Sequence, residues 1–160
     1  MNPALPDGRE GILPLLPHLR AYARSLTGDA TSADDLVQDG IMLALQAWHQ
    51  FTPGTNLKAW LFRILHNRHL TLRTRRHLGA EIGVDDLGEY ASVPAVQEGQ
   101  AELRHFVAAF RRLRPTHREV LVLWAVHGLH YEEIAAITDC PVGSVKSRMS
   151  RARATLKRLL

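Results

Sequence analysis

The side chains best suited to bind a polyanion lie near the end of the chain, in a stretch without acids. Residues 142–160 contain no Asp or Glu. The outward positions of the expected helix carry cations and hydroxyls: Lys146, Ser147, Ser150 and Arg151, with Arg148 and Arg153 on the flanks. A helix face that meets only water usually mixes both signs, because opposite charges four residues apart stabilise it. The pattern favours a face that approaches DNA, and a cationic helix that only aids solubility is the alternative.

Two short helices and a tight turn are expected to position this face. In the second helix, apolar residues recur at spacings of three and four and form one stripe: Val145, Met149, Ala152, Leu156 and Leu159. In the helix before it, Ile134, Ala135 and Ile137 face inward, and the small Ala135 lets the two helices cross closely. This is the pattern of a helix-turn-helix, whose second helix enters a DNA major groove.

Charge is distributed unevenly along the rest of the chain. The formal net charge of +4 favours a nucleic-acid partner. Residues 40–80 contain no acid and accumulate cations: Lys58, Arg63, Arg68, Arg73, Arg75 and Arg76. Residues 79–98 reverse the sign, with acids and no Lys or Arg. The chain therefore has three parts: a basic block, an acidic connector and a helical module with a basic end.

The N-terminal part is predicted to be helical. Apolar spacing from Leu13 to Leu26 predicts a helix that ends at Gly28. Thr31 or Ser32 then caps a second helix, which runs to about residue 49. That helix is expected to bury four residues or their neighbours: Leu36, Val37, Met42 and Leu45. Residues 51–56 form a loop in which Thr55 or Asn56 caps a third helix, and this helix carries the arginines on its polar side.

The C-terminal part is also predicted to be helical. Pattern resumes near residue 99, with apolar residues on one face: Leu103, Phe106, Val107 and Phe110. Thr116 and Glu119 form a capping box for the next helix, which stops at Gly128. No convincing strand pattern or internal repeat is present. We expect an all-α fold of two small helical domains, residues 1–78 and 99–160, joined by an acidic flexible linker over residues 79–98.

Several classes of function are not supported by the sequence. The single Cys140 excludes a disulfide framework and is expected to be a small buried residue. No apolar run approaches the roughly 20 residues that span a bilayer, and no export signal is evident, so we expect a cytoplasmic protein without a membrane partner. Histidine pairs lack the companion ligands of a metal site. We expect no metal, cofactor, small-molecule substrate or catalytic activity.

The motifs resemble those of a known family. Residues 33–39, then Trp48 and Phe51, then residues 58–67 and 73–76 resemble region two of extracytoplasmic-function sigma factors. Residues 113–120 and 131–153 resemble region four. The resemblance covers residues 10–160 in the right order, and the variants look most similar to the alphaproteobacterial general-stress subgroup. The resemblance implies a subunit that binds core RNA polymerase, recognises promoter DNA and is controlled by an anti-sigma factor.

The resemblance also implies partners for particular residues. The second helix would dock on the clamp helices of the largest polymerase subunit. The residues of this contact would be Asp34, Asp35, Leu36, Gln38 and Asp39. Another part of the chain would contact the flap of the polymerase. The acidic linker would thread the polymerase cleft, although a plain disordered tether has a similar composition.

The basic block would melt and hold the −10 element, with an unstacked base captured by the loop of residues 51–56. The residues implied are Phe51, Thr55, Asn56, Lys58, Trp60, Arg63, Asn67, Arg68, Arg73, Arg75 and Arg76. For Trp60, a place in the core is the stronger interpretation. Residues 146–153 would read the −35 element: Lys146, Ser147, Ser150 and Arg151 approach base edges, and Arg148, Arg153 and Lys157 hold phosphates.

Three hypotheses follow. The first is a promoter-specificity subunit of RNA polymerase. The second is a sigma-like adaptor that titrates an anti-sigma factor without binding DNA, although such an adaptor has no reason to keep the basic helix or the arginine block. The third is a helix-turn-helix repressor, which leaves the motifs around Asp34 and Trp60 unexplained.

Overall fold

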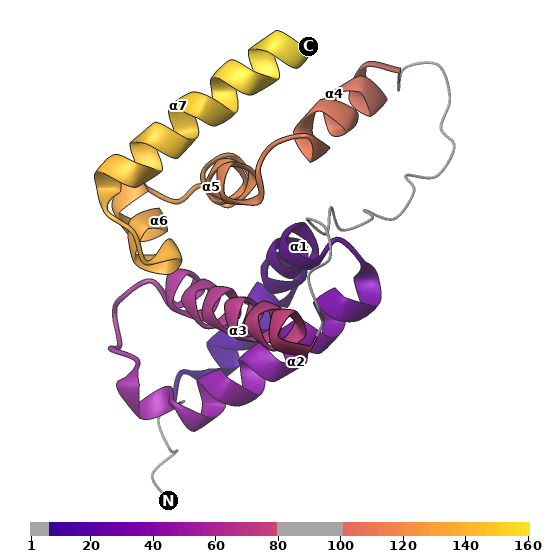
Figure 1. Cartoon of the computed structure of the whole chain (residues 1–160). Helices are drawn as coiled ribbons and strands as arrows, with labels where there is room; N and C mark the ends of the chain where they lie inside the picture. The colour runs from indigo at the N-terminus through magenta and orange to yellow at the C-terminus, as the bar shows by residue number, and fades with distance from the viewer. Residues whose placement is uncertain (1–6, 80–100) are drawn as a thin grey trace, which may run out of the picture. The chain divides into compact units, whose positions relative to one another are not determined.

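The computed structural model describes residues 7–79 and 101–160, and within these ranges the chain is helical without a strand (Figure 1). The expected all-α fold is confirmed. The chain divides into two compact units, Met1–Leu87 and Gly88–Leu160. Residues 80–98 of the expected linker lie outside the described residues, while Gly79 is still helical.

Three helices form the core of the first unit. A 3-10 helix η1 (Arg9–Leu15) leads into α1 (Leu16–Thr27), which is followed by α2 (Ala30–Gln46), a short η2 (Trp48–Gln50) and α3 (Leu57–Gly79). The three α-helices pack pairwise on one another. The rings of Tyr22 and Phe62 lie 4.5 Å apart at the centre, and both side chains are fully buried. Burial of these aromatic rings therefore joins α1 to α3.

The start of the first unit differs from its sequence-based prediction. Gly28 ends α1 in the left-handed conformation, as expected. Leu13 is exposed, however, because it belongs to the 3-10 helix and not to α1. The cap of α2 is Asp29, since its Oδ1 accepts a 2.8 Å hydrogen bond from the backbone N–H of Ser32. Hydrogen bonds from the backbone and the side chain of Ser32 lower the pKa of Asp29. The Asp29 carboxylate is therefore charged at neutral pH. Its contribution to stability is lost only as the pH falls and the carboxylate is protonated.

The inward face of α2 is built from small residues. Leu36 and Val37 are buried as predicted, but Met42 is 61% exposed and Leu45 is also exposed. Gly40 and Ala44 take the inward positions on the second half of the helix. A Cβ added at Gly40 would collide with the Cδ2 methyl group of the buried Leu65. Glycine at this position thus lets α2 and α3 approach closely.

This close approach gives a first testable prediction. Gly40→Ala should destabilise the first unit by about 1 kcal/mol, because overpacking of about 1–3 kcal/mol exceeds the gain in helix propensity. Gly79→Ala is the matched control, since nothing lies within 4 Å of an added Cβ there. Urea unfolding of both variants measures the difference. If Gly40→Ala were as stable as Gly79→Ala, the Leu65 side chain would be able to move aside without a loss of stability.

The second unit contains α4 (Ala101–Arg111), α5 (Pro115–Ala125), α6 (Tyr131–Thr138) and α7 (Val142–Leu159). Helix α7 packs on the other three. Its apolar stripe is buried as predicted from Val145 through Leu156, and Leu159 is half-buried. Ile134, Ala135 and Ile137 of α6 face it from the buried side.

Local details of the second unit depart from prediction. The capping box of Thr116 and Glu119 does not form: α5 begins at Pro115, its cap residue is Arg114, and Glu119 is buried. On α4, the predicted apolar face is largely uncovered, with Leu103 and Phe106 exposed. Phe106 stacks instead on Phe110 of the next turn, with ring centroids 6.0 Å apart.

Candidate nucleic-acid interface

A tight turn fixes the angle between α6 and α7. Asp139 ends α6 in the left-handed conformation (φ 49°, ψ 52°), which Asp adopts more readily than most residues. The backbone N–H of Cys140 donates a 3.1 Å hydrogen bond to the carbonyl of Ala135. Cys140 is half-buried, a correction to its expected burial, and its Sγ lies 3.2 Å from the Thr138 hydroxyl. Pro141 then starts α7. Together these contacts present α7 as the second helix of a helix-turn-helix.

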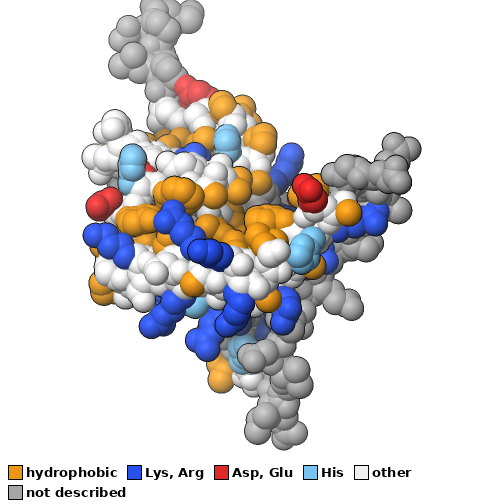
Figure 2. Space-filling model, turned by 90° about the horizontal axis from the view of Figure 1, so that it is seen from above, with side chains coloured by type: hydrophobic (Ala, Val, Ile, Leu, Met, Phe, Trp, Pro, Cys, Tyr) orange, Lys and Arg blue, Asp and Glu red, His pale blue; other side chains and the backbone are white. Residues whose placement is uncertain are grey.

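The outward face of α7 is cationic and available for binding. Lys146, Ser147, Ser150 and Arg151 are all exposed. Among residues 7–79 and 101–160, none of these four side chains makes a hydrogen bond or an ion pair. Figure 2 shows one face of the molecule, on which Lys and Arg side chains gather beside exposed hydrophobic ones. Unpaired cations at the start of a recognition helix suit a DNA groove.

The two flanking arginines of α7 differ in their surroundings. The Arg153 guanidinium lies over the Trp124 ring of α5, 4.8 Å from its centroid, a cation–π contact. Trp124 is 42% exposed, so this pair lies at the surface. Arg148 is half-buried. Arg153 therefore has an aromatic partner within the protein, whereas Arg148 is only partly buried.

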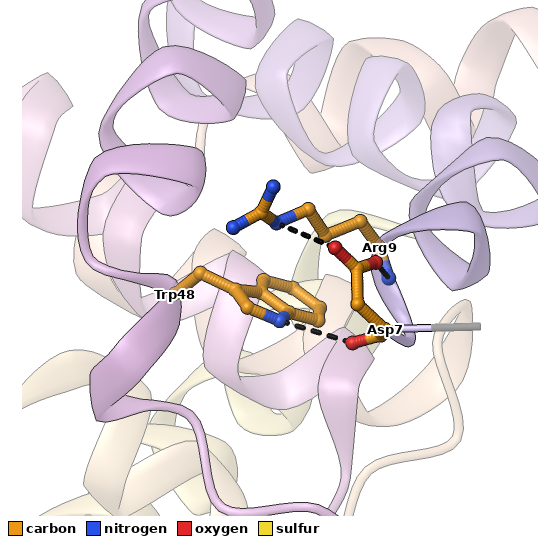
Figure 3. Close-up of polar contacts among 3 residues, drawn as sticks. All are labelled: Asp7, Arg9 and Trp48. Atoms are coloured by element: carbon orange, nitrogen blue, oxygen red, sulfur yellow. Dashed lines mark hydrogen bonds and ion pairs between the residues drawn. The ribbon is translucent and has the colours of Figure 1, made fainter. Parts of the chain in front are cut away.

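An aromatic cluster supports the loop of residues 51–56. The rings of Trp48, Phe51 and Trp60 lie within 5.2–5.9 Å of one another, and all three side chains are half-buried. The Trp48 indole N–H donates a 3.2 Å hydrogen bond to the carbonyl of Asp7, whose side chain pairs with Arg9 (Figure 3). Trp60 is therefore half-buried, and its ring packs in an aromatic cluster at the surface.

The polar residues of this loop shape its backbone. The Thr55 hydroxyl donates a 2.6 Å hydrogen bond to the carbonyl of Thr52, and Gly54 supplies a positive φ. Of the two predicted cap residues, Asn56 caps α3, because its Oδ1 accepts a 3.1 Å hydrogen bond from the Ala59 N–H. Thr55 and Asn56 are exposed, but their oxygens already serve the loop.

The basic residues of α3 do not share one face. Arg63 and Asn67 are one turn apart and exposed. Arg73, Arg75 and Arg76 are exposed around the last turns of the helix, and Arg76 is close enough to help lower the pKa of Asp29. Lys58 is half-buried at the start of α3. Only part of the block can meet one nucleic-acid strand from one side.

One ion pair links two surfaces that the sequence assigned to different partners. The Arg68 Nε donates a 2.9 Å hydrogen bond to Oδ2 of Asp39, and its Nη2 lies 2.8 Å from the same oxygen. Arg68 was expected at DNA and Asp39 at polymerase. Their pairing ties α3 to α2, so each charge has a partner within the described protein.

The first two turns of α2 present an acidic surface. Asp34, Asp35 and Gln38 are exposed, and among the described residues their side chains make no hydrogen bond or ion pair. Leu36 is only 1% exposed and belongs to the core, a correction to its expected place in the polymerase contact. We therefore assign Leu36 the task of orienting the helix.

Two other features, a metal site and a membrane-spanning helix, are absent from the described residues. Within the described ranges, no group of three or more His, Cys, Asp or Glu side chains could hold a metal ion. No helix among the described residues is both long and apolar enough to cross a membrane.

Comparison with known proteins explains this combination of surfaces. Residues 12–66 match the sigma2 domain of PhyR, and residues 104–156 match sigma-70 region 4. The chain is 44% identical over 155 residues to the ECF RNA polymerase sigma factor EcfG of Rhodopseudomonas palustris (strain TIE-1). This match covers 95% of the present chain and 84% of EcfG. The chain belongs to the extracytoplasmic-function sigma factors. This protein is therefore an RNA polymerase sigma factor that directs initiation at promoters, with region 2 in the first unit and region 4 in the second.

Solved structures agree with this membership. The sigma factor RpoE of Bartonella quintana, in complex with the anti-sigma factor NepR, has a TM-score of 0.77 at 37% identity and covers 97% of both chains. The anti-anti-sigma factor PhyR of Bartonella quintana, complexed with NepR, has a TM-score of 0.59 at 19% identity. It covers 93% of this sigma factor and 49% of PhyR, and it shows the shared fold alone.

Sequence reasoning missed two kinds of residue in this sigma factor. Trp124 lies on the helix predicted to stop at Gly128 and was given no role, because its partner Arg153 lies on a separate helix. Arg114 and His117 lie in the motif of residues 113–120, where they served only for family resemblance. Their position at the start of α5, which packs on α7, gives them a place beside the recognition helix.

Proposed function

We propose that three surfaces of this sigma factor divide its work, and that the acid-free outward face of α7 carries the assignment to DNA. That face would read the −35 element through Lys146, Ser147, Ser150 and Arg151. Arginine is the side chain best suited to guanine, because it can donate two hydrogen bonds to one base edge. Arg148 and Arg153, on the flanks of that face, would hold phosphates.

The −10 element would meet the loop of residues 51–56 and the exposed stripe of α3. Phe51 and Trp60 offer aromatic faces for an unstacked base. Arg63 and Asn67 would contact the strand, and Arg73 and Arg75 would neutralise phosphates further along the helix. Thr55 and Asn56 would act mainly by shaping the loop, because their oxygens accept or donate within it.

Core polymerase would contact the acidic surface of α2, formed by Asp34, Asp35 and Gln38. Exposed carboxylates without partners in their own protein suit a basic helix on another. Catalysis would belong to the polymerase, and the protein would act in the cytoplasm, where its polymerase is.

This assignment predicts the outcome of a charge reversal. Asp35→Lys should weaken binding to purified core RNA polymerase on the order of tenfold at low salt, because a favourable charge pair becomes a repulsive one. Adding Asp34→Lys should weaken binding further. Glu10→Lys is the matched control, being exposed in the same unit with the same change of charge. Titration of labelled variants with polymerase measures this effect, and equal losses from Asp35→Lys and Glu10→Lys would remove α2 as the contact.

Control by an anti-sigma factor in a stress response is part of the proposal. The solved complex of RpoE with NepR supports it, because that sigma factor covers nearly the whole of this chain. The match of region 2 to the PhyR domain keeps one alternative in view, an adaptor that titrates an anti-sigma factor without binding DNA. The unpaired cations of α7 favour the sigma factor, since an adaptor gains nothing from them.

A further inference from the structure

Four basic groups lie where the start of α5 meets α7, close enough for three guanidiniums to act on the His117 imidazole. Arg114 is the cap residue of α5, and His117 follows in its first turn. Arg148 and Arg151 come from α7, which packs against α5. Arg114 and Arg151 are exposed, while His117 and Arg148 are half-buried. The group therefore lies at the surface, where a ligand can reach its two exposed members.

This basic cluster has no counter-charge within the described protein. Among residues 7–79 and 101–160, none of its four side chains makes an ion pair or a hydrogen bond. Burial and the nearby Arg114, Arg151 and Arg148 guanidiniums lower the pKa of His117, in that order of influence. No carboxylate of the described residues offsets them in their effect on His117. Like charges held together without an acid repel, and an anion bound among them relieves that repulsion.

We propose that Arg114 and His117 of α5 join Arg148 of α7 in a composite site for one backbone phosphate of the −35 DNA, beside the base edge that Arg151 reads. The interface thereby extends beyond the helix-turn-helix onto the preceding helix. This inference rests on the proposed −35 function and adds two residues to it. Phosphate is the expected ligand because the site lies beside the recognition face and contains donors only.

Binding of the phosphate is coupled to a proton. In the free protein the lowered pKa keeps the His117 imidazole largely neutral at neutral pH. A phosphate placed against the cluster favours the imidazolium and raises that pKa. Between the free and the bound pKa, binding takes up a proton, so affinity rises as pH falls. Below the free pKa the imidazole is already charged, and the dependence levels off.

The test uses holoenzyme and a promoter fragment that the wild-type holoenzyme transcribes. Affinity is measured from about pH 6 to about pH 8, a range that brackets the titration of histidine. Wild type should bind more tightly as pH falls, by up to about tenfold per pH unit, the limit for one coupled proton. His117→Gln should lose that component, and His117→Arg should bind tightly with the component also absent. His105→Gln, at an exposed histidine on α4, should keep the wild-type profile.

A second readout does not depend on titration. Arg114→Gln should reduce the slope of log affinity against log salt by about one, as expected for one lost phosphate contact. A wild-type pH profile in His117→Gln, or a wild-type salt slope in Arg114→Gln, overturns the composite site. If His117→Gln fails to fold, His117→Arg and the exposed Arg114→Gln decide the matter. Failure of the −35 assignment is a different result, in which Arg151→Ala also binds DNA as wild type.

Discussion

Phe62→Ala should unfold the first unit of this sigma factor, or leave it barely stable. The Phe62 ring is fully buried against Tyr22, at the centre of the three-helix core. Truncation of a buried Phe typically costs about 3–5 kcal/mol, from lost burial and the cavity that remains. A whole small domain is stable by only about 5–15 kcal/mol. Region 2 should therefore lose most of its stability, and with it the ability to support transcription.

Urea unfolding followed by tryptophan fluorescence measures this effect. Trp48 and Trp60 report on the first unit, and Trp124 reports on the second. Leu78→Ala is the matched control, because Leu78 lies on the same helix and is 84% exposed. Its expected effect is within about 0.5 kcal/mol. If both variants unfolded at the wild-type urea concentration, the assigned core would be incorrect.

Arg151→Ala should weaken use of the −35 element by about 1–3 kcal/mol, the value of a good base contact. Arg151 is exposed on the outward face of α7 without a partner among the described residues, so its fork of donors is available to a base edge. The loss should depend on sequence. Wild type should discriminate among base pairs at one −35 position, and the variant should tolerate all of them more equally.

Arg158→Ala is the control that distinguishes sequence-specific contact with a base from non-specific attraction to the DNA charge. Arg158 is exposed on the same helix, seven residues or about two turns further from its start. It should contribute little sequence preference, because the start of a recognition helix meets the bases. Binding of each variant holoenzyme to a set of single-base promoter variants provides the comparison. A uniform loss in Arg151→Ala across all sequences would make Arg151 a phosphate contact.

The strongest patterns in the sequence predicted the structure well. The apolar stripe of α7, with Val145 and Met149 at its start, is regular over four turns, so its buried side and cationic outer side follow directly. Glycine at the end of α1 was located correctly, and the cap of α3 is Asn56, one of the two residues predicted for it. Such features depend on neighbours in the chain, which the sequence displays.

Features that depend on packing were less predictable. The buried face of α2 was predicted incorrectly beyond Val37, because Gly40 and Ala44 occupy it. Gly40 lets α2 approach α3 closely, and hydrophobic spacing does not reveal such a contact. The α2 cap could be Asp29, Thr31 or Ser32 by residue type, and only the backbone decides. The pairs Arg68–Asp39 and Arg153–Trp124 join separate helices, so the sequence showed each residue without its partner.

In vitro transcription with purified core RNA polymerase tests the central claim most directly. Wild-type protein added to core enzyme and a library of genomic fragments should yield transcripts from discrete start sites, and core enzyme alone should not. Arg151→Ala should reduce transcription from those same sites, while Arg158→Ala should preserve their order of strength. The absence of any promoter-directed transcript from the wild-type protein, despite demonstrated binding to core enzyme, would contradict the account.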